Sequence, residues 1–245
     1  AALRGLATDF NLPPPWAYYV PGHSLGEYSA RVAVGALGVA DAAKLRRMRG
    51  NAMQSAVAPG EGAMAALLGA TVAQAEAACD VGRADGGVCE IANDNAIGQI
   101  VLSGTKAAID LACAASRDIG IKKAMALNVS APFHCSLMSP AADAMAEALR
   151  DAMIAEPSVA VVTNVTAKPT KDPEEIRQNL VAQVTGRVRW TETIQFMASE
   201  GIETTGEAGA GKVLSVMQRR IEKSLNGLTL GTPADLEAFA EAIRG

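Results

Sequence analysis

The sequence predicts an α/β protein in which a small subdomain is inserted into a larger one. A short apolar run over residues 17–20 leads into Gly-His-Ser-Leu-Gly at residues 22–26, and a helix-compatible run follows. This is the strand, sharp turn and helix that a G-x-S-x-G motif requires. Further along, residues 63–127 show the ferredoxin-like order of strand, helix, strand, strand, helix and strand. We therefore expect a large α/β subdomain from residues 1–58 and 128–245, with a ferredoxin-like insertion at 59–127.

The composition is that of a globular protein with a sizeable core. Of the 245 residues, 49% are hydrophobic and 20% are charged. The formal net charge is −4 and no run of like charges occurs, so we expect neither nucleic acid nor a membrane as a partner. No apolar stretch reaches the ~18 residues of a membrane-spanning helix, and no charged-then-apolar leader precedes the first strand.

Cysteine and histidine usage gives no sign of a metal site. The chain has four cysteines without C-x-x-C spacing, Cys79, Cys89, Cys113 and Cys135. It has only two histidines, so a zinc site is not expected. We predict reduced thiols, no metal and a cytoplasmic location.

The first residues of the sequence resemble the end of a helix. Leu3, Leu6 and Phe10 recur at helical spacing, and Pro13-Pro14-Pro15 then predicts an extended connection. A sheet that carries a serine turn of this kind normally has earlier strands, and one of their loops supplies half of the oxyanion hole. We therefore expect an N-terminal portion that this sequence does not contain.

The helix after the serine turn carries one arginine in an unusual place. It is predicted over residues 41–56 with Asp41 as its N-cap. Its apolar positions recur at helical spacing: Leu45, Met48, Ala52, Met53 and Ala56. At ~100° per residue, Arg47 lies on the far side while Arg49 projects into the apolar face. Such an arginine either reaches back to solvent or pairs with an anion, and its planar fork suits a carboxylate.

The inserted segment is predicted to contain four strands and two helices. The strands are residues 63–68, 88–92, 99–103 and 121–127, and the helices are 71–80, with Thr71 as its cap, and 106–119. Asn93-Asp94-Asn95 is expected to form a turn, and the alternative is that Asn93 and Asn95 face the substrate.

The C-terminal part is predicted to alternate helices and strands. The first helix is residues 140–156, with Met145, Leu149 and Met153 on one face. The second starts at Asp172-Pro173 and buries Ile176, Leu180 and Val184. Three more follow: one capped by Thr191 and ended by Gly201, one ending near residue 224, and one over residues 234–243. The strands are residues 159–165 and 202–205. Residues 206–212 match G-x-x-x-x-G-K, but Val213 stands where the phosphate loop needs Ser or Thr, and Glu207 adds negative charge, so nucleotide binding is rejected.

Ser24 is the candidate nucleophile, because the turn exposes its hydroxyl at the N-terminus of a helix. The alternative is a chance serine in a glycine-rich turn. His134 is the candidate base, since His23 adjoins the serine and should point elsewhere. A purely structural histidine is the alternative. No Asp or Glu stands out as the group that orients His134.

These residues resemble the malonyl-CoA:acyl-carrier-protein transacylases of bacterial type II fatty acid synthesis. The similarity covers nearly the whole chain and rests on seven stretches: Gly22 to Ala30, Met48-Arg49-Gly50 with Met53-Gln54, Gly62 to Ala66, Asn93-Asp94-Asn95, Ser130 to Cys135, Gln183 before Val188-Arg189-Trp190, and Gly211 to Leu214. The resemblance implies an α/β-hydrolase-like large subdomain with a ferredoxin-like insertion. It also implies malonyl-CoA and acyl carrier protein as partners, with no cofactor.

By position, the resemblance gives each site residue a role. Ser24 matches the nucleophile that accepts the acyl group, His134 the base, and Arg49 the partner of the malonyl carboxylate. Gln183 matches the residue whose backbone carbonyl orients the histidine. The family's Gly-Gln-Gly-Ser-Gln stretch does not occur in this sequence, which leaves the Leu25 N–H as the one oxyanion donor that can be named.

Two other functions stay open. A serine thioesterase or esterase would use the same nucleophile, although a carboxylate anchor such as Arg49 has little use for uncharged acyl chains. A non-catalytic fragment could bind only carrier protein or coenzyme A. For docking of an acidic carrier protein, the basic side chains suggested by the sequence are Lys122, Lys123, Arg187 and Arg189.

Overall fold

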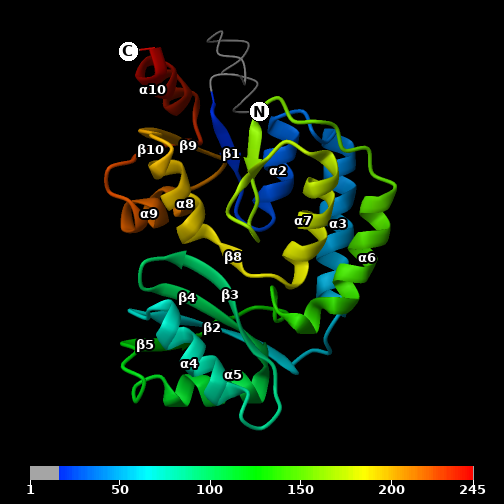
Figure 1. Cartoon of the computed structure of the whole chain (residues 1–245), viewed down its shortest axis with the longest axis vertical. Helices are drawn as coiled ribbons and strands as arrows, with labels where there is room; N and C mark the ends of the chain where they lie inside the picture. Colours follow the sequence, from blue (N-terminus) through cyan, green and yellow to red (C-terminus); the bar gives the residue numbers. More distant parts are fainter. Residues whose placement is uncertain (1–16, 245) are drawn as a thin grey trace.

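The structure, a computed structural model, describes residues 17–244, in which a three-stranded, a five-stranded and a two-stranded sheet are surrounded by helices (Figure 1). The helix and the proline connection expected before residue 17 lie outside these residues. The elements up to the second sheet are β1 (Tyr19–Pro21), α2 (Gly26–Ala33) and α3 (Val39–Ser55). After it come the short 3₁₀ helix η2 (Ser136–Met138), α6 (Ser139–Arg150), β6 (Ala160–Val162), β7 (Pro169–Thr170), α7 (Pro173–Thr185), β8 (Val188–Arg189), α8 (Trp190–Ser199), β9 (Thr204–Ala208), α9 (Val213–Ile221), β10 (Asn226–Leu230) and α10 (Pro233–Arg244).

The first sheet brings two loops together at one edge. Its strand order is β1-β6-β7, and β1 runs parallel to β6 with Pro21 opposite Val162. Because parallel strands end at the same edge of a sheet, the serine turn after β1 lies beside the loop after β6. Helices α2, α3, α6 and α7 bury the main apolar core, which includes Tyr28, Met53 and Leu180.

The second sheet has the strand order of a ferredoxin-like subdomain plus one further strand. It consists of β2 (Gly62–Leu68), β3 (Cys89–Ala96), β4 (Gln99–Thr105) and β5 (Lys123–Ala126), in the antiparallel order β5-β2-β4-β3. Helices α4 (Val72–Gly82) and α5 (Lys106–Ala115) pack against it and share a separate core (Figure 1). The predicted α/β fold class is confirmed, while we keep the subdomain boundaries as a proposal.

A fifth strand, β8, joins this sheet from the other part of the chain. It runs parallel to β3, with Asn93 opposite Val188. The sequence pattern does not predict β8, β7 or β10. The first two are only two residues long, which is too short for an alternating apolar pattern to identify.

Several predicted details of the elements are wrong. Helix α3 starts after Gly38, so Asp41 lies inside its first turn, and Met48 is half exposed. Helix α6 ends at Arg150, which leaves Met153 84% exposed. Thr191 lies within α8 and donates its hydroxyl to Asp94 Oδ1 (2.7 Å) rather than capping the helix.

Asn93-Asp94-Asn95 does not form the turn of the β3–β4 hairpin. The three residues belong to β3 and are buried, and the turn lies two residues later at Ile97-Gly98, where Gly98 has φ 73°. A positive φ is easily adopted by glycine, which explains why the turn forms there. The consequence is that the Asn95 side chain is available for a contact outside its own sheet.

The rejected phosphate loop is occupied by a carboxylate. Residues 204–208 form β9, longer than predicted, and the Glu207 carboxylate accepts hydrogen bonds from Leu214 N (3.1 Å) and Ser215 N (2.8 Å). These are the amide groups at the start of α9 that would otherwise face an anion.

Three further findings concern the described residues. All four cysteines are free thiols, and three of them are buried. No helix within residues 17–244 is long and apolar enough to cross a membrane. In the same range, no group of three His, Cys, Asp or Glu side chains is arranged to hold a metal ion.

Helix α7 should depend on its N-cap. Asp172 Oδ1 accepts hydrogen bonds from Glu174 N (2.8 Å) and Glu175 N (3.5 Å), with Pro173 in the first position. We expect Asp172→Ala to lower the free energy of unfolding by about 1 kcal/mol, as loss of such a cap typically does. Asp41→Ala is the matched control, since Asp41 caps nothing and should cost less than half as much. Urea denaturation of both variants checks this, and equal losses would contradict it.

Candidate active site

The serine turn holds Ser24 in a strained backbone conformation. Ser24 lies between β1 and α2 with φ 48°, and Leu25 is the N-cap of α2. A Cβ atom on Gly22 would lie 2.2 Å from Gly26 O, so the turn can close only with glycine at position 22. Among the non-glycine residues of the described chain, positive φ occurs at Ser24, at His134 (59°) and at Ala167. Such strain persists only where surrounding contacts hold it, and it is concentrated at functional sites.

Ser24, His134 and Gln183 form a hydrogen-bonded chain. Ser24 Oγ lies 2.7 Å from His134 Nε2, and His134 Nδ1 lies 2.8 Å from the Gln183 carbonyl oxygen. Because a carbonyl can only accept, Nδ1 carries the proton, and the lone pair on Nε2 faces the serine hydroxyl. The arrangement can therefore move a proton from Ser24 to His134, as a nucleophile and its general base require.

His134 is buried and neutral. Burial, followed by the nearby positive charge of Arg49, lowers the pKa of His134 from 6.5 to about 3, although the hydrogen bond to Gln183 acts in the opposite direction. The imidazole therefore keeps its lone pair available throughout the physiological pH range.

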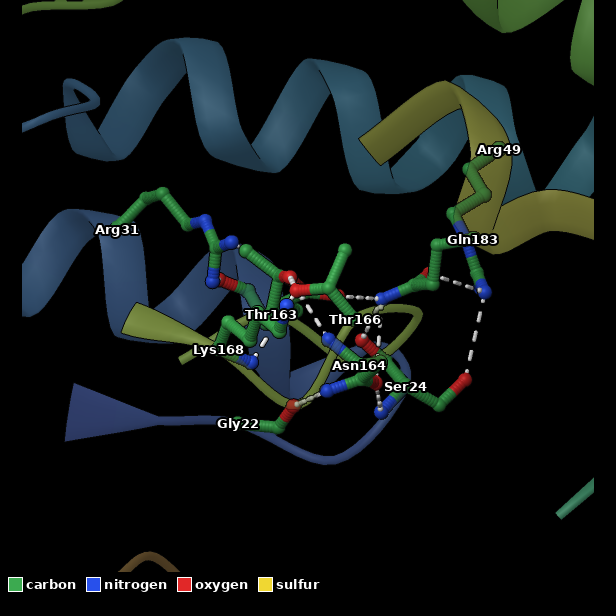
Figure 2. Close-up of polar contacts among 10 residues, drawn as sticks. Gly22, Ser24, Arg31, Arg49, Thr163, Asn164, Thr166, Lys168 and Gln183 are labelled. Carbon is green, nitrogen blue, oxygen red and sulfur yellow. Dashed lines mark hydrogen bonds and ion pairs between the residues drawn. The ribbon is translucent and has the colours of Figure 1, made fainter. Parts of the chain in front are cut away.

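Arg49 reaches the serine from α3. Its Nη2 donates to Ser24 Oγ (3.3 Å) and to Gln183 Oε1 (3.0 Å), as Figure 2 shows. The side chain is buried, which lowers the pKa of Arg49, while Tyr28 and Glu27 act to raise it. Its Nε has no hydrogen-bond partner among the described residues. A cation with unused donor capacity next to Ser24 can bind an anionic group.

The side chain of Gln183 connects these groups to a buried ion pair. Its Nε2 donates to Ser24 O (3.0 Å), to Glu27 Oε2 and to Asn164 Oδ1 (3.3 Å). Glu27 and Arg31, both fully buried, form an ion pair at 2.5 Å. Burial raises the pKa of Glu27, and the charge of Arg31 opposes the rise. Glu27, Arg31 and Asn164 also belong to the site, and no local sequence signal predicts them.

His23 points away from Ser24 Oγ, as expected, and contacts the second sheet. Its Nε2 donates to Asn95 Oδ1 (2.7 Å), and its ring meets Trp190 edge to face at 5.3 Å between centroids. Asn95 therefore links the serine turn to β3. The structure thus brings together Ser24, His134, Arg49 and Gln183, with Leu25 next to the serine.

Comparison with known proteins agrees with this geometry. The acyl transferase domain family matches residues 18–226. Over 217 residues the chain is 44% identical to the malonyl CoA-acyl carrier protein transacylase of Salmonella typhimurium, a match that covers 89% of this chain and 70% of that protein. The chain belongs to the malonyl CoA-acyl carrier protein transacylase family.

Solved structures of this family have the same fold. The acyl-carrier-protein-S-malonyltransferase of Bartonella henselae is 48% identical, with a TM-score of 0.90 over 94% of this chain and 73% of that one. A malonyl-transacylase solved in complex with a type II polyketide synthase acyl carrier protein has a TM-score of 0.89 at 38% identity, over 92% of this chain and 72% of that one. The resemblance to transacylases expected from the motifs is therefore confirmed.

The four basic residues proposed for docking lie at the two outer strands of the second sheet. Lys123 lies on β5, and Arg189 lies on β8. These are the two outer strands of the second sheet, about 19 Å apart at the usual strand spacing. Arg189 is also paired with Glu192 at 2.5 Å. A docking surface that includes these four residues stays a prediction.

Burial of neutral His134 should make stability depend on pH. The folded pKa lies below the unfolded value, so the unfolded state binds more protons and stability falls as pH decreases below 6.5. We expect about 1.4 kcal/mol to be lost through this group between pH 7.5 and 5.5. Comparing urea denaturation of wild type and His134→Gln at both pH values isolates the contribution of His134, because the two proteins share all other titrating groups. Identical pH dependence in the two proteins would rule it out.

Proposed function

We propose that this protein is a malonyl-CoA:acyl carrier protein S-malonyltransferase that works through a malonyl-serine intermediate. The observation that carries the proposal is the position of Arg49, whose guanidinium lies 3.3 Å from the oxygen of a histidine-activated serine. The named transacylase relatives support the same reaction. Ser24, His134, Arg49, Leu25 and Gln183 keep the roles expected from the sequence.

The first half-reaction follows from the geometry. Ser24 Oγ attacks the malonyl thioester carbon while its proton passes to His134 Nε2, which the Gln183 carbonyl holds in the required tautomer. The Leu25 N–H, at the N-terminus of α2, donates to the oxyanion. The carbon–sulfur bond then breaks, and His134 returns the proton to the sulfur of coenzyme A.

The second half-reaction reverses these steps with a different thiol. His134 takes the proton of the phosphopantetheine thiol of acyl carrier protein, the sulfur attacks the malonyl-serine ester, and the proton returns to Ser24. The carrier-protein complex among the related structures supports this partner. The free thiols of all four cysteines favour a cytoplasmic location.

Arg49 distinguishes this function from that of a thioesterase or esterase. A buried guanidinium beside the nucleophile suits an acyl group that ends in a carboxylate, because the two groups can form paired hydrogen bonds. An esterase for uncharged acyl chains would gain nothing from desolvating this charge.

Covalent labelling tests the nucleophile. We expect intact-mass measurement after addition of malonyl-CoA to show one malonyl group on wild type and none on Ser24→Ala, because the accepting oxygen is gone. His134→Ala should acquire the group far more slowly, since general-base catalysis contributes roughly 10²–10⁴-fold. A stable malonyl adduct on Ser24→Ala would overturn the assignment.

Substrate preference tests Arg49. Arg49→Ala leaves the malonyl carboxylate without its counter-ion, a loss on the order of 2–5 kcal/mol. We expect kcat/KM for malonyl-CoA to fall roughly 30- to 4000-fold, while acylation by acetyl-CoA, which lacks the carboxylate, falls much less. Arg49→Lys should restore malonyl preference only in part, because an ammonium lacks the planar fork.

Arg47→Ala is the matched control for this experiment. Arg47 lies on the exposed side of the same helix, so its removal should leave both substrates unaffected. Equal losses for malonyl and acetyl groups in Arg49→Ala would show that Arg49 supports the fold and does not select the substrate.

A further inference from the structure

The side chain of Asn164 bonds to the two peptide groups that flank His23, immediately before the nucleophile. Asn164 follows β6 and is 1% exposed. Its Oδ1 accepts the hydrogen bond of the Ser24 backbone N–H at 2.6 Å, and its Nδ2 donates to Gly22 O at 2.7 Å. Figure 2 shows this amide lying between the two peptide groups. No hydrogen bond from Asn164 goes to Ser24 Oγ, so any effect on the nucleophile must pass through the backbone.

The turn needs an external restraint of this kind. A non-glycine residue at φ 48°, such as Ser24, costs about 1–2 kcal/mol relative to an ordinary conformation. The two bonds from Asn164 hold the peptide groups on either side of His23. While α2 stays in place, a change in φ of Ser24 must rotate the peptide between His23 and Ser24, which breaks the hydrogen bond from Ser24 N–H to Asn164 Oδ1. These two hydrogen bonds, which we call the Asn164 clamp, therefore oppose relaxation of Ser24 toward a negative φ.

Asn164 is itself firmly placed. Its backbone N–H donates to Glu27 Oε1 (3.4 Å), and its carbonyl accepts from Arg189 N (2.9 Å). Its Oδ1 faces the N–H groups of Ser24 and Gln183, while its Nδ2 faces a carbonyl. A flipped amide would set donor against donor at one end and acceptor against acceptor at the other, so the orientation is unambiguous.

We propose that Asn164 is a positioning residue for catalysis, which fixes the backbone of Ser24 so that Oγ stays within hydrogen-bond reach of His134 Nε2. It acts before any substrate-specific contact, so it should matter equally for every acyl group. The proposal rests on the proposed function only in taking Ser24 as the nucleophile.

The first test compares acylation rates of Ser24 in Asn164→Ala and wild type. Single-turnover acylation is followed by intact mass with malonyl-CoA and acetyl-CoA. We expect a loss on the order of 10²-fold, the cost of displacing a reacting atom by about 1 Å. The loss should be similar for both substrates, unlike that of Arg49→Ala. A folded variant that acylates within threefold of wild type overturns the proposal.

Gln218→Ala is the matched control. Gln218 is also a buried amide, 3% exposed, whose Oε1 accepts from Thr205 Oγ1 and whose Nε2 donates to Leu225 O (3.2 Å). Its loss should lower the unfolding free energy about as much as that of Asn164 without changing acylation of Ser24. If both variants lose acylation equally, the role of Asn164 is merely structural.

Asn164→Asp gives a readout that a structural role would not produce. A protonated carboxyl can accept from Ser24 N–H and donate to Gly22 O, whereas a carboxylate has no proton to donate to Gly22 O and adds a second negative charge near Glu27. The other charged groups nearby are Arg31 on α2, Arg49 on α3 and Arg189 on β8, with neutral His134 beyond Gln183. We expect single-turnover acylation of Ser24 to be faster in Asn164→Asp than in Asn164→Ala at low pH, where the carboxyl is protonated, and the difference to disappear as the pH rises and the carboxyl ionises. Equal rates of the two variants at every pH overturn the clamp.

A third reagent separates this proposal from the proposed function. Phenylmethylsulfonyl fluoride sulfonylates activated serines without any need for a malonyl or carrier-protein site. If wild type reacts with it or with acetyl-CoA but takes no malonyl group, the proposed function fails, and the same variants still test the clamp. A wild-type Ser24 that is inert to all three reagents overturns both.

Discussion

The side-chain amide of Gln183 lies between a buried carboxylate and a buried guanidinium, and the other contacts around Ser24 are arranged about it. Its nitrogen faces Glu27, whose charge is balanced by Arg31, and its oxygen faces Arg49. In a low-dielectric interior such a network is strong when every group is satisfied and costly when one is missing. The amide therefore links α2, α3 and α7, which place Ser24 in the turn before α2, Arg49 on α3 and the carbonyl that accepts from His134 on α7.

The sequence predicted which residues meet at the site better than it predicted the residues that hold them in place. Ser24, His134 and Arg49 could be found because each departs from its local background: a serine between glycines, a histidine in a loop, an arginine on an apolar face. Glu27 and Asn164 show no such departure. Glu27 contacts Gln183 across 156 residues of sequence and Asn164 contacts Ser24 across 140, and no periodicity encodes a pairing at that separation.

The same limit explains the errors in the fold. Local signals such as the Thr71 capping box and the Asp172-Pro173 helix start were read correctly, because caps and turns depend on neighbouring residues. Asn93 to Asn95 were assigned to a turn because their composition favours one. Pairing of β3 with both β4 and β8 overrides that preference, so tertiary hydrogen bonds win over local propensity. The resulting strand carries Asn95 to His23 and so ties the second sheet to the serine turn.

The acceptor that orients His134 is a main-chain carbonyl, and this has a consequence for how such a site can change over time. Every amino acid has a backbone carbonyl, so a substitution at position 183 keeps that acceptor. It is lost only if the substitution changes the path of the backbone at the end of the helix. Alanine scanning would accordingly record only the side-chain half of what Gln183 does. A site with an acidic third member loses it by one substitution, whereas here the tautomer of the histidine follows from the path of the backbone, and a substitution at this position disturbs the side-chain network without removing the acceptor of His134.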